Sequence, residues 1–296
     1  MRQNIFEQIK SNWNVSDAIR RIHRLFQNEK AVSYSDGCKR YEVSLLNIVD
    51  NYCFELWANN GHMLCLHDFL EALCFDEMYK KAVEENSEES TINYIEIVEN
   101  CLYLFMSKYR QLDFFKYGDI RTTAKLRLLN DNLNDVLDHL NMKVEYFAEK
   151  EQAIIIERDP AVTAAAEISS NETAYEIIFY NHHTLKGNTK EKARILNYLA
   201  NDFETQRKEL SRINSSLASD IACLLNSLNI RHNNVDQKSN SYHSTVAQMP
   251  LNELEAWYDE LYQMLLLARL EIDNIERKQK VADLKKVFES EKQNNG

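Results

Sequence analysis

A cluster of polar side chains follows a predicted amphipathic helix in the last third of the chain. The sequence "LNSLNIRHNNVD", residues 225–236, places Arg231, His232, Asn233 and Asn234 directly behind an apolar helical face. The guanidinium of an arginine can hold a phosphate through two parallel hydrogen bonds. An imidazole can accept or donate a proton near neutral pH. The cluster therefore contains the side chains needed for acid–base chemistry on a phosphate ester.

The same residues also suit a purely structural role. Asparagine tolerates the left-handed conformation that commonly closes a helix, so Asn233 and Asn234 are typical of a cap followed by a solvated turn. The loop that follows runs 19 residues, from Arg231 to Met249, without clear periodicity. Loops of this length are usually functional or disordered. It also contains Tyr242 and His243, which would add a phenol and a second imidazole to the site if the loop folds back.

Roughly the last 125 residues resemble the HEPN superfamily of bacterial defence and toxin-type ribonucleases. The resemblance rests on a run of four helices whose third helix ends in an arginine followed by a polar residue. The stretches "DPAVTAAAEI" through "LNIRHNNVD" and "ELEAWYDELYQMLLLARLEID" also resemble uncharacterised bacterial proteins associated with abortive phage infection. The resemblance implies metal-independent RNA cleavage, in which a 2′-hydroxyl attacks the adjacent phosphate where two protomers meet. Arg231 would match the arginine, and His232 the polar position after it.

The chain departs from the family pattern at one position. The pattern continues with a short spacer and a histidine, whereas this chain has Asp236 there. A carboxylate repels a phosphate, and it cannot act as an acid near neutral pH unless its pKa is strongly raised. The resemblance therefore implies that His232 or His243 supplies the proton transfer, or that the site is inactive. Asn233 or Asn234 would orient the substrate or the histidine.

Other segments offer weaker candidates for chemistry. In "HMLCLHD" the potential ligands are His62, Cys65, His67 and Asp68, but the two histidines do not share a helical turn and no second ligand pair follows. His182 and His183 lie at a predicted helix end, where capping explains them, although they could also contribute to the Arg231 pocket. No Gly-rich phosphate loop and no G-x-S-x-G motif is present, which argues against nucleotide-binding and common hydrolase classes. We expect no metal and no cofactor.

Composition restricts the partners and the compartment. The net charge is −11, which argues against broad electrostatic binding of nucleic acid, so an RNA contact must be local. Six cysteines occur without a C-x-x-C pair and mostly in apolar helical runs, which indicates reduced, buried thiols and a cytoplasmic location. The first residues lack an apolar core, and no stretch approaches the roughly 20 apolar residues of a membrane span. We expect no membrane contact.

The supporting elements should be helical, because Gly and Pro together number only seven. We predict an all-α fold with a helical N-terminal module at 1–141, a hairpin near 142–158 within a hairpin-and-linker segment at 142–170, and a four-helix HEPN-like bundle at 171–296. In the N-terminal module, apolar stripes predict a helix containing Ala18, Ile22, Leu25 and Phe26, another containing Leu45, Ile48, Val49, Tyr52 and Leu56, a third from Leu64 to Ala82, and a fourth ending before Gly118. The helices are expected to be interrupted at "SYSDGCKR" and "NNGH".

The helices of the bundle are predicted from their caps. The first begins at an Asn171 cap and stops near Gly187, Asn188 caps the second, the third begins near Ser215 and the fourth near Pro250. The fourth repeats apolar residues in a 4-3 spacing at Leu254, Tyr258, Leu261, Leu265, Ala268, Ile272 and Ile275. Such a seam requires a neighbouring helix, either within the bundle or on a second copy in a homodimer.

These features lead to two hypotheses of function. The first is a metal-independent endoribonuclease of an anti-phage or toxin–antitoxin system, whose N-terminal half senses a signal or binds a protein partner. The alternative is a non-enzymatic helical interaction protein, or an antitoxin or immunity partner, in which "RHNN" is a structural polar hub.

Overall fold

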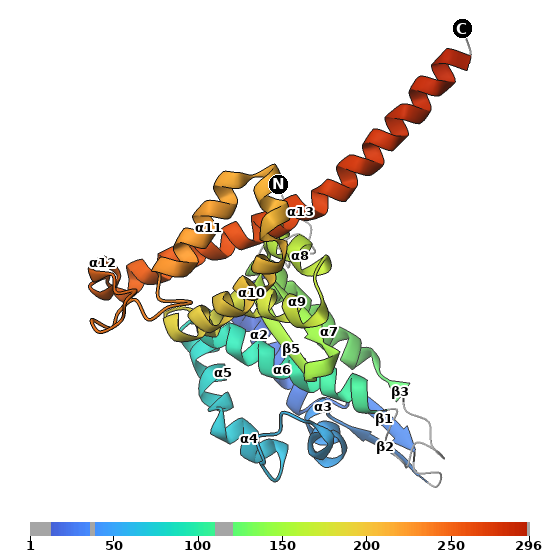
Figure 1. Ribbon diagram of the computed structural model, residues 1–296. Coiled ribbons are helices and arrows are strands. Elements are labelled where there is room, and N and C mark those ends of the chain that lie inside the picture. The colour runs from blue at the N-terminus through green and yellow to red at the C-terminus, as the bar shows by residue number, and fades with distance from the viewer. Residues whose placement is uncertain (1–12, 36–38, 110–120, 295–296) are drawn as a thin grey trace, which may run out of the picture. The chain divides into compact units, whose positions relative to one another are not determined.

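The computed structural model describes residues 13–35, 39–109 and 121–294, with side chains of the last helix described as far as residue 288. The chain divides into two compact units, Met1–Arg158 and Asp159–Gly296. Helices dominate both, and the strands of the described residues form two small sheets (Figure 1). The predicted mostly helical fold with a small hairpin is confirmed. The segment predicted as hairpin and linker, 142–170, is shared between the units, because the hairpin lies in the first and helix α8, Pro160–Glu167, begins the second.

Four amphipathic helices form most of the first unit. These are α2 (Val15–Gln27), α5 (Phe75–Glu84), α6 (Glu88–Lys108) and α7 (Ala124–His139), and α2 packs on α5 and α7 while α5 packs on α6. Three of these helices begin at a capping residue: the side chains of Asn14, Ser87 and Thr123 each accept a main-chain hydrogen bond. The largest fully buried side chains of the core include Phe26, Phe54, Tyr94 and Phe105.

Two of the predicted helices are broken. The stretch from Leu64 to Ala82 forms α4 (Leu66–Ala72) and α5, because Cys74 adopts a left-handed conformation with φ +55° between them. The stripe from Leu45 begins as α3 (Leu45–Ile48) but continues as a π-helical turn and then a 3₁₀ turn. This change of helical pitch leaves Leu56, expected on the buried stripe, 47% exposed.

A small antiparallel sheet replaces predicted helix and loop. Strand β1 (Val32–Ser35) lies between β2 (Arg40–Val43) and β3 (Arg121–Thr122), with Val32 opposite both Val43 and Thr122. The sequence did not predict this sheet within the mostly helical fold, because strands of two to four residues are too short to show a period. Cys38 and the predicted helix end before Gly118 lie outside the described residues.

The predicted hairpin is present and packs within the first unit. Strands β4 (Met142–Phe147) and β5 (Gln152–Glu157) pair antiparallel, and β5 also contacts α6. The outer edge of β5 is bound by side chains of α6. Asn100 accepts a hydrogen bond from the Ala153 N–H at 2.9 Å and donates one to the Ala153 carbonyl at 2.8 Å, and Glu96 accepts one from the Ile155 N–H at 2.9 Å.

The second unit is built from helices, and a long loop joins α11 to α12. Its elements are α8, α9 (Asn171–Tyr180), a 3₁₀ turn (His183–Leu185), α10 (Thr189–Ile213), α11 (Ser215–Ser227), α12 (Ser244–Ala247) and α13 (Leu251–Asn294). The predicted Asn188 cap is confirmed, since its side chain accepts a hydrogen bond from the Glu191 N–H at 3.1 Å. The cap of α9 is Ser170 rather than Asn171, because the Ser170 hydroxyl accepts from Thr173.

Helix α13 packs against α10 and α11 along the predicted seam (Figure 1). Leu254, Tyr258, Leu261, Leu265 and Ala268 are buried, so this part of the seam is an intramolecular bundle contact rather than a dimer interface. Ile272 and Ile275 are half-buried, and the side chains from Glu276 to Phe288 are exposed. None of the described helices is both long and apolar enough to cross a membrane.

Candidate functional site in the loop after helix α11

The candidate site begins where helix α11 ends. Asn229 adopts the left-handed conformation, with φ +58°, immediately after Leu228 at the C-cap. The hydroxyl of Tyr258 on α13 donates a hydrogen bond to the Leu228 carbonyl at 3.0 Å, in a buried position. The end of α11 is thereby fixed to the last helix, and the direction in which the chain leaves α11 is set.

Asn234 organises the loop that follows. It is fully buried, and its side-chain oxygen accepts a hydrogen bond from the Asn229 N–H at 2.9 Å. Its side-chain nitrogen donates to the carbonyls of Asn226 at 3.0 Å and Ser241 at 2.7 Å. Every donor of this amide is therefore used to hold the loop closed. The side chain serves the loop and is out of reach of a substrate.

Main-chain hydrogen bonds connect Asn234 to two histidines whose side chains are exposed. The Asn234 N–H donates to the His232 carbonyl at 2.9 Å, and the His243 N–H donates to the Asn234 carbonyl at 2.8 Å. Both histidine side chains are exposed. The loop therefore folds back as one of the sequence interpretations requires, and it brings the main chain of His243 next to that of the His232–Asn234 segment.

The remaining polar residues of the loop shape its turns. The exposed Asn233 accepts a hydrogen bond from the Asp236 N–H at 3.2 Å through its side-chain oxygen. Asp236, at the position where the family pattern has a histidine, is exposed and accepts a hydrogen bond from the Lys238 N–H at 2.9 Å. Both contacts are short-range turn contacts of the kind asparagine and aspartate commonly form.

Arg231 is paired with helix α10. Its guanidinium forms an ion pair of 2.7 Å with Glu204 and donates a second hydrogen bond to the Ala200 carbonyl at 3.2 Å. The Arg231 side chain is 19% exposed, whereas that of Glu204 is 38% exposed. Glu204 neutralises part of the positive charge, and it also fixes the plane of the guanidinium at the edge of the loop. Sequence reasoning did not identify Glu204, because 27 residues separate it from Arg231.

A second polar network lies between α9, α10 and α13. The ammonium of Lys192 is 2.8 Å from the Glu255 carboxylate and 2.7 Å from that of Asp259. The Tyr180 hydroxyl donates to Asp259 at 2.9 Å. Burial acts to raise the pKa of Glu255, but the hydrogen bonds from Lys192 and the Gly187 N–H outweigh it, so that the pKa lies below its usual value. Burial, followed by the nearby Asp259 charge, raises the pKa of Tyr180 far above its usual range. This network stabilises the packing of the three helices.

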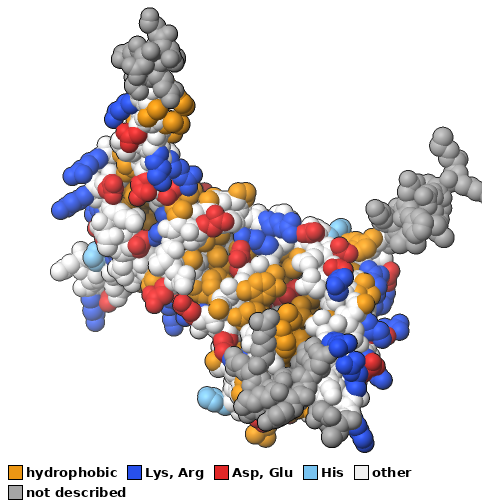
Figure 2. Space-filling view, turned by 90° about the vertical axis from the view of Figure 1, so that its right-hand side faces the viewer, with side chains coloured by type: hydrophobic (Ala, Val, Ile, Leu, Met, Phe, Trp, Pro, Cys, Tyr) orange, Lys and Arg blue, Asp and Glu red, His pale blue; other side chains and the backbone are white. Residues whose placement is uncertain are grey.

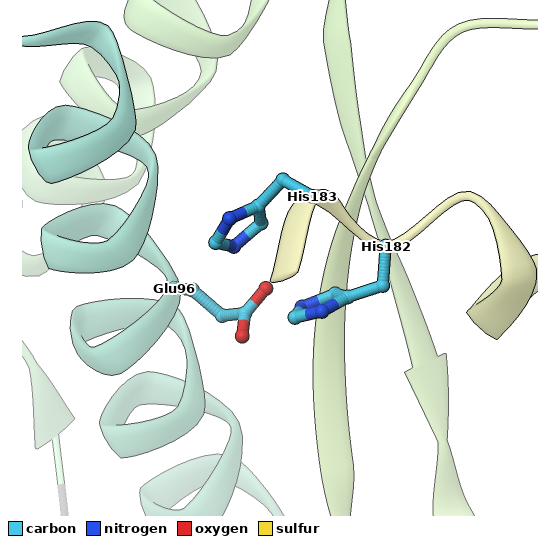
Figure 3. Close-up of side chains that lie close together, drawn as sticks. All are labelled: Glu96, His182 and His183. Carbon is cyan, nitrogen blue, oxygen red and sulfur yellow. The ribbon is translucent and has the colours of Figure 1, made fainter. Parts of the chain in front are cut away.

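Among the described residues of the second unit, the histidine pair after α9 has no third metal ligand beside it. Figure 3 shows the two imidazole rings of His182 and His183. Their ring centroids are 4.4 Å apart, and His182 Nδ1 is 2.6 Å from the Thr184 hydroxyl. Zinc sites use three or four protein ligands. Glu96, also labelled in Figure 3, belongs to α6 of the first unit, where it accepts the hydrogen bond from Ile155.

In the "HMLCLHD" segment, Cys65 and His67 make local contacts. Cys65 caps α4 by accepting a weak hydrogen bond from the Asp68 N–H, and His67 contacts Asp50 at 3.3 Å. The five described cysteines are free thiols. Burial raises the pKa of Cys53 and of Cys101 to about 12, which keeps both protonated and unreactive. Cys74 and Cys223 are exposed, contrary to the expectation of buried thiols.

A comparison of the chain with family models, with curated proteins and with solved structures finds no match.

Proposed function

We propose that the chain is a metal-independent endoribonuclease that acts through Arg231, His232 and His243. One observation carries the proposal: the side chains of His232 and His243 are both exposed, and the main chain of each is hydrogen-bonded to the main chain of the buried Asn234. Cleavage by a 2′-hydroxyl needs one group to accept its proton and another to protonate the leaving 5′-oxygen. Two imidazoles can supply both, because one can be neutral and the other charged near neutral pH.

The other residues fit supporting roles in this chemistry. Arg231 would contact the phosphate, with Glu204 holding the plane of its guanidinium. Asn233, which is exposed, would contact the substrate, while Asn234 positions the loop from beneath. Because two histidines are available, Asp236 need not act as an acid.

The remaining expectations belong to this proposal. RNA would bind only locally, since a net charge of −11 opposes broad phosphate contacts. A homodimer that completes the site would use surfaces other than the buried part of the α13 seam. The first unit would bind a protein partner or sense a trigger in anti-phage defence, and the free thiols fit a cytoplasmic location.

The test compares RNA cleavage by purified wild type with that by Arg231→Ala, His232→Ala and His243→Ala, in a buffer containing EDTA. We expect the wild type to cleave labelled single-stranded RNA, leaving a 2′,3′-cyclic phosphate, and to spare a 2′-deoxy substrate. Each variant should lose at least about 100-fold in rate, whereas the exposed-histidine control His67→Ala should keep full activity. Equal rates in all proteins, or no cleavage by the wild type, would overturn the proposal.

A second candidate is a non-enzymatic interaction protein, and the Arg231–Glu204 ion pair favours it. A guanidinium already held by a carboxylate and a carbonyl, beside a fully bonded Asn234, also suits a structural hub. Under this alternative, Arg231→Ala lowers the melting temperature or releases a bound protein, and the histidine variants have no effect. Co-purification with a basic toxin would identify the antitoxin or immunity form of this function.

A further inference from the structure

An open apolar groove lies in the first unit, formed by α6, β3, α7 and β4. Its volume is about 550 Å³, which is within the range of small-molecule sites. The groove is lined by Leu102, Tyr103, Met106, Thr122, Leu126, Arg127, Asn130 and Tyr146. Five of these side chains are aliphatic or aromatic, and the other three are polar: Thr122, Arg127 and Asn130. Figure 2 shows one face of the molecule on which hydrophobic side chains gather beside Lys and Arg side chains.

The apolar surface of the groove is unusually accessible. Met106 is 49% exposed and Tyr146 48% exposed, while Leu102 and Leu126 are mostly buried beneath them. Exposed apolar residues are common individually, but several around one concave surface indicate a binding site. A ligand in the groove would therefore remove exposed apolar surface from water.

One wall of the groove is held rigid. The Tyr146 ring stacks on Tyr103, with ring centroids 5.5 Å apart and an interplanar angle of 26°. The Tyr146 hydroxyl donates a hydrogen bond of 3.0 Å to the buried carboxylate of Glu99. Because both the face and the hydroxyl of the ring are engaged, a ligand meets a fixed aromatic surface and loses little free energy in ordering it.

Arg127 supplies a charge at the same groove. It is exposed and has no carboxylate partner among the residues that the structure describes. An arginine fork recognises a planar carboxylate through two parallel hydrogen bonds. One arginine beside a mainly apolar surface matches a ligand with one negative charge and an apolar body.

We propose that this groove binds a small amphipathic carboxylate, with its apolar chain against Met106 and Tyr146 and its carboxylate on Arg127. A doubly charged phosphate head group is a poorer match, because Arg127 is the one charged residue among the described residues that line the groove. The groove belongs to the first unit and the loop after α11 to the second, and the proposal does not depend on RNA cleavage.

The test is calorimetric titration of the full chain with decanoate, decyl phosphate and decan-1-ol, each below its aggregation or solubility limit. Decanoate should bind with a dissociation constant of roughly 10–100 µM, as partial burial of a ten-carbon chain allows. Arg127→Gln should weaken decanoate binding about tenfold without affecting decan-1-ol, and Arg127→Lys should restore part of the loss. Met106→Asp should weaken both ligands.

Leu128→Asp is the matched control, because Leu128 is 49% exposed on the same helix as Arg127 and does not line the groove. It should leave decanoate binding unchanged, and circular dichroism should show all variants to be folded. The proposal is overturned if decanoate does not bind below 1 mM (about −4 kcal/mol), if decan-1-ol or decyl phosphate binds as tightly as decanoate, or if Arg127→Gln binds decanoate like the wild type.

Discussion

The side-chain amide of Asn234 donates a hydrogen bond of 2.7 Å to the main-chain carbonyl of Ser241. Ser241 follows Asn234 by seven residues, so this bond closes a short loop. His232 lies two residues before this loop and His243 two residues after it. The positions of the two histidines therefore depend on a residue that does no chemistry itself.

Replacing Asn234 with alanine should destabilise the second unit. The substitution removes the hydrogen bonds that the Asn234 side chain makes to the main chain of Asn229, Asn226 and Ser241, at a cost of about 3 kcal/mol. Urea unfolding measures this loss. Asn233→Ala is the matched control, since Asn233 is exposed and makes one turn contact, and it should change stability by less than about 1 kcal/mol. Equal effects of the two substitutions would contradict the role of Asn234 as the organiser of the loop.

The buried Glu99 should make the stability of the first unit fall as pH rises. Burial raises its pKa to about 7, while the hydrogen bond from Tyr146 acts in the opposite direction. Because the folded state holds the proton more tightly than the unfolded chain, the contribution of Glu99 is fully present below pH 4.5 and is lost as pH rises through 7. The total loss is on the order of 3 kcal/mol.

The measurement for Glu99 is the free energy of unfolding of the first unit between pH 4.5 and pH 8. Glu99→Gln retains an acceptor for Tyr146 but cannot titrate, so its curve should lack the decline seen between about pH 5 and 7.5 in the wild type. If the two proteins show parallel pH profiles, Glu99 is ionised without cost in the folded state.

Removing the charge of Lys192 should weaken the packing of α10 on α13. Lys192→Met leaves Glu255 and Asp259 without their ammonium partner, which should cost about 2 kcal/mol at pH 7, less than for a fully buried pair because Asp259 is 50% exposed. The folded-state pKa of Glu255 is lowered, so the difference from wild type should be present above pH 4.5 and shrink as pH falls. Lys190→Met, an exposed lysine of the same helix, is the control. A pH-independent difference would assign the effect to packing rather than to charge.

Features with local causes were predictable from the sequence. The hairpin at 142–158 follows from two β-prone runs, and the Asn188 cap from the preference of asparagine for that position. The strands β1 to β3 were not, because they are short and β1 pairs with β3 about 90 residues away. The break at Cys74 was also missed, since a left-handed cysteine has no sequence signature.

The candidate site was predictable in its composition but not in its connections. Arg231, His232 and the asparagines could be selected because their side chains suit phosphate chemistry or capping. Four adjacent polar residues in a sequence do not show which side chain faces water and which faces the core. Asn234 is buried and Asn233 exposed, because only Asn234 meets the carbonyls of Asn226 and Ser241, and that depends on the closure of the loop.

The side chains that cover β5 also affect how copies of the chain meet. A two-stranded hairpin normally offers an open strand edge to which another β-strand can add, and such edges promote aggregation. Asn100 and Glu96 already occupy main-chain groups of Ala153 and Ile155 at this edge. Helix α6 thus prevents a strand of another molecule from adding to β5. A chain with alanine at both positions would keep its helices but expose a strand edge at which β-sheet association can begin.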